Sequence, residues 1–85
     1  MDELIHLLQQ FENDTSLNYE EDEFISNTEA GACASGILID EHGQCDWENI
    51  NILETKGFCV IPIEKDSFGW LVGGIVTKKG IITYG

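Results

Sequence analysis

Apolar residues near the N-terminus recur at steps of three and four positions, with acidic and amide residues between them. This period predicts an amphipathic helix over residues 2–12, and Asp2 can cap its N-terminus or lie favourably at its positive end. The turn-favouring residues 13–16 predict where the helix ends. The apolar positions of this helix are Leu4, Ile5, Leu7, Leu8 and Phe11.

The next segment, residues 17–29, has a much weaker pattern. It carries the acidic run Glu20–Glu23 and only four apolar or aromatic anchors, so both a short helix and an irregular loop fit it. The anchors are Leu17, Tyr19, Phe24 and Ile25.

Residues 30–40 change from small side chains to branched apolar ones. The small residues 30–36 predict a loop or a close approach between two backbones. The run 36–40 has the length and the composition of a strand. Residues 41–44 predict a turn after it, with Gly43 at a positive φ angle.

Residues 46–57 allow two interpretations. Ile50 and Ile52 alternate as in a strand, but the ends of the segment favour a helix. Asp46 is a capping residue, and Gly57 can adopt the left-handed conformation that ends a helix. We therefore expect a second helix here.

The C-terminal part of the chain predicts three strands in a meander, over residues 58–64, 70–77 and 80–84. Pro62 has no N–H group for the ladder, so the first of these strands is expected at an edge of the sheet or with a bulge. The pair Gly73-Gly74 predicts a bend or a close approach by another element.

Together these elements predict an α+β fold in a single small acidic domain over residues 1–85. An antiparallel sheet of about four strands, ending in the C-terminal meander, is expected. The N-terminal helix and the second short helix are expected to cover one face of this sheet.

The charge of the chain is unusual for its size. Sixteen Asp and Glu residues stand against four Lys residues and no Arg, which gives a formal net charge of -12 on 85 residues. Residues 1–54 carry 14 acids and no Lys, whereas residues 55–85 carry all four Lys and two acids. Such a surface repels phosphates and anionic lipids, so direct binding to nucleic acid or to a membrane is excluded as a function.

Cys33, Cys45 and Cys59 are an odd number of thiols without paired spacing, which favours free cysteines in a reducing compartment. Together with His42 they lack the two close ligand pairs of a structural zinc site, so we expect no metal and no cofactor. Cys45 beside His42 is the one candidate for thiol catalysis, but the acids around it disfavour the thiolate. We expect that the protein is not an enzyme.

No segment is apolar over the length of a membrane span, and the N-terminus is acidic where a secretory signal is basic. These features predict a cytoplasmic protein, in the source cell or in the host cell if a phage encodes it.

A charge of this size exceeds what solubility requires and destabilises the compact state by self-repulsion, which indicates that the acids have a use. In size and charge the chain is similar to the acidic immunity proteins of nuclease toxins and to the DNA-mimic inhibitors that phages direct against restriction and CRISPR enzymes (anti-CRISPR proteins). The leading hypothesis is therefore an inhibitor that binds the basic, nucleic-acid-binding surface of a nuclease or another DNA- or RNA-handling protein. The predicted contact residues are Asp14, Tyr19, Glu20, Glu21, Asp22, Glu23, Asp40, Glu41 and Trp47.

The alternative is a structural or assembly protein that associates with itself. The two hypotheses together leave two oligomeric states open, a monomer or a homodimer. In this hypothesis the acids only face solvent, and the apolar C-terminal sheet forms the contact. The residues expected in that contact are Val72, Ile75, Val76, Ile81 and Ile82.

Overall fold

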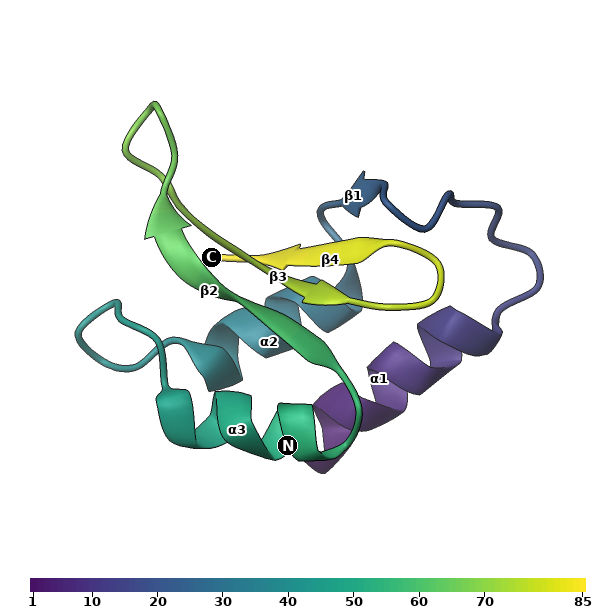
Figure 1. Cartoon of the computed structure of the whole chain (residues 1–85), viewed down its shortest axis with the longest axis horizontal. Helices are drawn as coiled ribbons and strands as arrows, with labels where there is room; N and C mark the ends of the chain where they lie inside the picture. Colours follow the sequence, from purple (N-terminus) through teal and green to yellow (C-terminus); the bar gives the residue numbers. More distant parts are fainter.

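The computed structural model describes all 85 residues, Met1 to Gly85. It has an α+β fold in which three helices lie together on one side of a four-stranded sheet (Figure 1). None of the helices has both the length and the hydropathy needed to cross a membrane. The elements in chain order are α1 (Asp2–Asn13), β1 (Phe24–Ile25), α2 (Glu29–Leu38), α3 (Trp47–Thr55), β2 (Cys59–Lys65), β3 (Leu71–Val76) and β4 (Ile81–Tyr84).

The sheet has the strand order β1-β4-β3-β2. Strands β2, β3 and β4 form the predicted antiparallel meander, but β1 pairs with β4 in parallel, so the sheet is mixed. The prediction of a wholly antiparallel sheet is wrong in this one strand. Because the chain passes through α2 and α3 between β1 and the meander, a parallel pairing becomes accessible to β1.

The loop predicted over residues 30–36 and the strand predicted over 36–40 are both wrong, because this stretch forms the helix α2. Thr28 caps the helix, since its Oγ1 accepts a hydrogen bond from the N–H of Gly31 at 2.9 Å. The small residues do allow a close approach, but within a helix. A Cβ atom on Gly31 would lie 2.5 Å from the carbonyl oxygen of Thr83 in β4.

The other two predicted helices are present, but Met1 and not Asp2 is the N-cap of α1, and Asp2 lies in the first turn at its positive end. Helix α1 buries Leu4, Leu8 and Phe11, as its period predicts. Helix α3 begins after Asp46, whose carboxylate accepts a hydrogen bond from a backbone N–H of the first turn, and Gly57 follows its end with a φ angle of 95°.

The hydrophobic core lies between the sheet and the helices. One side chain from each strand forms a buried row across the sheet, in the order Ile25, Ile82, Ile75 and Val60. Helices α2 and α3 cover this row, and α1 packs against α2. The buried helix residues are Leu4, Leu8, Phe11, Ala30, Ala34, Leu38, Ile50 and Leu53.

Strand β2 is an edge strand with an irregularity between Ile61 and Glu64, as Pro62 predicts. At this irregularity the N–H of Ile63 donates a hydrogen bond to the Sγ of Cys45 at 3.0 Å. The predicted close approach at the glycine pair is also confirmed, because a Cβ atom on Gly73 would lie 2.5 Å from the ring of Tyr84.

Candidate partner-binding surface

The fold divides the charge of the chain between its layers. All three helices come from residues 1–55, which carry 14 acids and no Lys, and the meander β2, β3 and β4 comes from residues 59–84. The helices and the loops between them are therefore strongly negative. The meander carries three of the four Lys residues against two acids and is close to neutral, and Lys56 is the C-cap of α3.

None of the sixteen acidic side chains is buried, and no Lys ammonium lies within ion-pair distance of a carboxylate. The one contact in that range joins His42 Nε2 to Glu41 Oε1 at 3.6 Å, and it is an ion pair only when the imidazole is protonated. These charges are spread over a body of 37 × 28 × 18 Å. The negative potential is thus left without compensation within the molecule.

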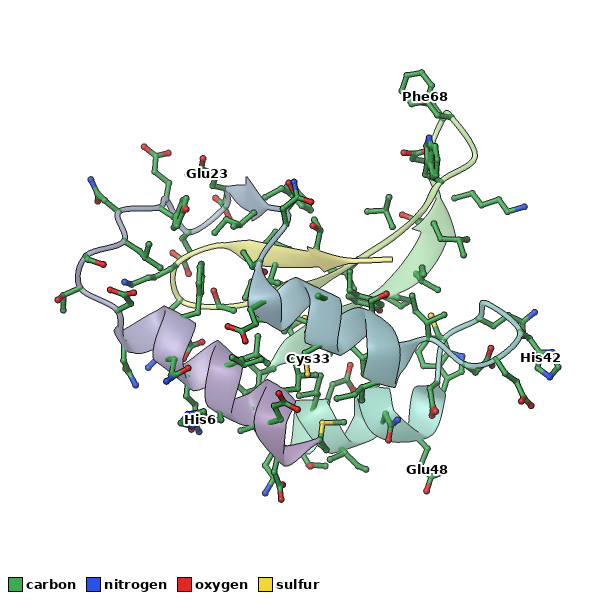
Figure 2. The ribbon with its side chains drawn as sticks, turned by 180° about the vertical axis from the view of Figure 1, so that it is seen from behind. His6, Glu23, Cys33, His42, Glu48 and Phe68 are labelled. Carbon is green, nitrogen blue, oxygen red and sulfur yellow. The ribbon has the colours of Figure 1, made fainter.

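Glu20–Glu23 form an exposed β-turn, which we call the acidic turn. The N–H of Glu23 donates to the carbonyl oxygen of Glu20 at 3.0 Å, and the N–H of Ile81 donates to the carbonyl oxygen of Glu23 at 2.8 Å. None of the four carboxylates accepts a hydrogen bond from the protein. The acidic turn is therefore held by its backbone, and its four side chains are exposed, as Figure 2 shows for Glu23.

Two further predicted contact residues shape the loop that carries the acidic turn. The Asp14 carboxylate accepts hydrogen bonds from the Oγ and the N–H of Ser16, and these bonds lower the pKa of Asp14 below its ordinary value. The ring of Tyr19 stacks on Phe11 with 5.9 Å between the centroids. Tyr19 is thereby attached to the core and anchors the loop.

The remaining predicted contact residues, Asp40, Glu41 and Trp47, lie at the opposite end of the longest axis of the molecule. Figure 2 shows this separation by the positions of Glu23 and of His42, the neighbour of Glu41. The structure therefore brings the predicted residues into two groups and does not join them in one patch.

Asp40 has a structural role, and the same role recurs at Asp66. Each carboxylate Oδ1 accepts hydrogen bonds from the N–H groups two and four residues later, at 2.8 to 3.0 Å. In both turns a glycine three residues after the aspartate has a positive φ angle, 73° and 85°. The sequence carries a signal for this pair of turns, the pattern Asp-x-x-Gly, in 40–43 and 66–69.

The second of these turns forms the tip of the β2–β3 hairpin. It presents two aromatic side chains that the sequence analysis did not select, Phe68 at 85% exposure and Trp70 at 72%. The hairpin extends beyond the sheet on the side away from the helices (Figure 1). Exposed aromatic residues of this kind are enriched among the residues that dominate the energy of protein interfaces.

The face of the sheet that the helices leave uncovered is also apolar, and we call it the outer sheet face. The strand register places Phe24, Ile81, Val76 and Cys59 in one row across all four strands. By contrast, Ile75 and Ile82, which the sequence suggested for a self-association contact, belong to the core at 0% exposure. The next row of the outer sheet face is Thr83, Gly74 and Ile61, followed by Val72 and Glu64.

The three thiols are free and lie in different parts of the fold. Burial raises the pKa of Cys33, and Glu3 adds to this effect, so its thiol stays protonated at neutral pH. Cys45 is bonded to the backbone of β2, and Cys59 is exposed on the outer sheet face. No group of three His, Cys, Asp or Glu side chains is arranged to hold a metal ion.

Comparison with known proteins adds no family to these observations. The chain matches no protein-family model, and searches of the curated proteins and of the solved structures found no match.

Proposed function

We propose that this protein is an acidic inhibitor that binds the basic, nucleic-acid-binding surface of a nuclease or another DNA- or RNA-handling protein. The observation that carries this proposal is the set of sixteen accessible carboxylates, none of which is paired with a Lys. A surface that binds a polyanion carries the Lys and Arg side chains that could pair with these carboxylates.

The charge density is comparable to that of the ligand it would replace. Duplex DNA of the same length as the molecule, 37 Å, carries about 22 phosphates, since one charge occurs per 1.7 Å of axis. The protein carries sixteen carboxylates on that length. Long-range attraction of this size accelerates association with a basic partner and weakens as salt is added.

The acidic turn is the part of the surface that best fits a contact. Asp14 and Asp40 already accept hydrogen bonds within their own turns, whereas the carboxylates of Glu20–Glu23 have no partner in the protein. Four exposed charges on one β-turn can meet Lys and Arg side chains without breaking any internal bond.

The test is affinity capture from lysate of the source cell or its host, at salt concentrations from about 50 to 500 mM. We expect a basic nucleic-acid enzyme that elutes as salt rises, is displaced by competing DNA, and is inhibited by the purified protein. The quadruple variant E20Q/E21Q/D22N/E23Q should bind at least about tenfold more weakly.

The matched control is E3Q/E29Q/E48Q/E54Q, which removes the same number of charges from exposed helix positions. It should lose much less affinity if the acidic turn is the contact. Equal losses in both variants would assign the binding to net charge alone. A partner that binds equally well at all salt concentrations, or that has no nucleic-acid substrate, would contradict the proposal.

Self-association is a second candidate, because the outer sheet face is apolar and uncovered. Two of the five residues expected in that contact are in the core, which leaves Val72, Val76 and Ile81. Sedimentation velocity across a range of protein concentrations tests it: a monomer at all concentrations removes this function.

A further inference from the structure

The outer sheet face departs from the usual pattern of a sheet that packs on one side. Such a sheet alternates apolar residues toward the core with polar residues toward water. Here most residues that face away from the helices are apolar, with Thr83 and Glu64 as the polar exceptions, and Phe24 is 63% exposed. An uncovered apolar surface of this kind is a candidate interaction site.

Acidic groups outnumber basic ones at both ends of this face: the four acids of the acidic turn lie beside Lys78 and Lys79, and Glu64 and Asp66 flank Lys65. Aromatic groups accompany them. The acidic turn precedes Phe24 at one end, and the hairpin tip carries Asp66, Phe68 and Trp70 at the other. Figure 2 shows Glu23 and Phe68 at these two ends, on the side of the sheet away from the helices. Between them, the rows from Phe24 to Cys59 and from Thr83 to Ile61 contain no charged residue.

The dimensions of the face fit one helix. The six residues of β3 span about 20 Å, and the four strands are about 14 Å wide. An α-helix with its side chains is about 10 to 12 Å wide, and about 13 residues cover 20 Å. The footprint of about 280 Å² is well below the roughly 800 Å² per partner of a standard interface, so a helix on this face needs further contacts at the two ends of the face.

Charge is what disfavours a second copy as the occupant. Each copy carries a net charge of -12, and two outer sheet faces in contact would bring two acidic turns and two hairpin tips together. Like charges within a Debye length of about 10 Å repel one another. A basic segment meets the opposite situation, because its Lys and Arg side chains reach acids at both ends of the face.

Both edges of the sheet disfavour a partner that adds a strand. Strand β1 is two residues long, and in the edge strand β2 Pro62 has no N–H while the N–H of Ile63 is bonded to Cys45. An occupant must therefore lie on the face of the sheet and not along its edge.

We propose that the outer sheet face binds a basic amphipathic helix of the partner. The apolar side of that helix lies on Ile81, Val76 and Ile61, and its Lys and Arg side chains contact the acidic turn at one end and Glu64 and Asp66 at the other. This inference rests on the proposed function, because it names the element of the basic partner that the protein recognises.

The test uses a labelled synthetic helix of about 14 residues, made of Leu and Lys with all Leu on one side, and fluorescence anisotropy. A scrambled peptide of the same composition is the charge-matched comparison. We expect the scrambled peptide to bind at least about tenfold more weakly. The variant V76T/I81T keeps the β-branched shape and the net charge, and it should lose at least about tenfold in affinity for the amphipathic peptide. The control E48Q/E54Q alters exposed positions of α3 and should change that affinity by less than about threefold.

A measurement on the unaltered protein is independent of whether any variant folds. Cys59 is exposed in the proposed contact, whereas Cys33 is half-buried in α2. The amphipathic peptide should slow alkylation of Cys59 and leave alkylation of Cys33 unchanged. Equal binding of both peptides, or an unprotected Cys59, would overturn the proposal.

The outcomes separate this inference from the proposed function. A captured nuclease whose binding is insensitive to V76T/I81T would leave the function standing and remove the docking of a helix. Peptide binding with protection of Cys59, but without a nucleic-acid enzyme in the capture, would retain the docking surface and remove the inhibitor role. Reversible dimers that V76T/I81T dissociates would identify a second copy as the occupant and overturn the proposal.

Discussion

The hydroxyl of Tyr84 donates a hydrogen bond to the carbonyl oxygen of Ile61 at 3.0 Å, and it reaches across the intervening strand β3 to do so. The ring lies over Gly73, where a Cβ atom would be 2.5 Å from its Cζ atom. One side chain from the last strand therefore supports the backbone of the edge strand beside Pro62. Without Gly73 the ring could not take this path.

Replacing Tyr84 by Phe removes this hydrogen bond and keeps the ring. The carbonyl of Ile61 then loses its side-chain donor in a poorly solvated position, so we expect a loss of about 1 to 2 kcal/mol in the free energy of unfolding. Urea denaturation followed by circular dichroism measures it. An unchanged midpoint would show that the bond adds nothing to stability.

The free energy of unfolding should fall steeply in alkali because Tyr84 ionises there. Burial raises the pKa of Tyr84 to about 12, above the value of about 10 in the unfolded chain, with a smaller effect from Cys45. The unfolded state therefore releases its proton first, and the stability present below pH 10 is lost as pH rises toward 12, by about 2 to 3 kcal/mol. Denaturation at pH 8 to 12 tests this, and Y84F should show a smaller decline.

Two glycine substitutions should change the free energy of unfolding in opposite directions. Gly73→Ala forces the ring of Tyr84 to move and should cost about 1 to 3 kcal/mol. Gly36 lies exposed in α2 with no atom within 4 Å of an added Cβ, so Gly36→Ala should stabilise the protein by about 0.5 to 1 kcal/mol. Thermal melts of the two variants decide the matter. A stabilising G73A would show that the ring is free to shift.

The two Asp-x-x-Gly turns should respond alike to loss of the aspartate. Asp66→Ala removes the acceptor for the N–H groups of Phe68 and Trp70 and should cost about 1 to 2 kcal/mol. Asp66→Asn keeps an oxygen acceptor and should retain most of the stability. The same pair of substitutions at Asp40 is the parallel test. If Asn and Ala variants unfold at the same urea concentration, charge and not the hydrogen bonds stabilises the turn.

Added salt should stabilise the protein. The uncompensated charge of -12 repels itself, and a rise from about 20 to 500 mM NaCl shortens the Debye length and screens this repulsion. The melting temperature should therefore rise with salt. In E20Q/E21Q/D22N/E23Q the net charge is -8 and the dependence should be weaker. A melting temperature independent of salt would mean that the acids are too far apart to interact.

The parts of the fold that follow from the sequence are those in which local signals agree. Asp46 and Gly57 mark the two ends of α3, and the apolar period of α1 marks its buried side. Pro62 indicates the edge strand with its irregularity. In each case the residue acts through its own backbone or its own helix, so no distant contact is needed to interpret it.

The stretch 30–40 could not be interpreted in this way. Gly31 and Gly36 lower its helix propensity although its three alanines favour a helix, and its β-branched end favours a strand. Tertiary packing overrides both preferences, because the helix buries Ala34 and Leu38 and only a residue without a side chain fits beside Thr83 at Gly31. The fourth strand is then supplied by Phe24 and Ile25, a pair too short to be recognised without its partner β4.

The sequence by itself determined the size of the negative charge, its concentration in residues 1–54, and the elements at both ends of the chain. The charge depends only on composition, and the elements at the two ends depend on local periodicity, so neither requires knowledge of tertiary contacts. Only the tertiary structure decided that the predicted acids form two separate groups, and that Val76 and Ile81 face outward while Ile75 and Ile82 face the core. In a strand, adjacent residues point to opposite faces, and only the packing of the helices determines which face is covered.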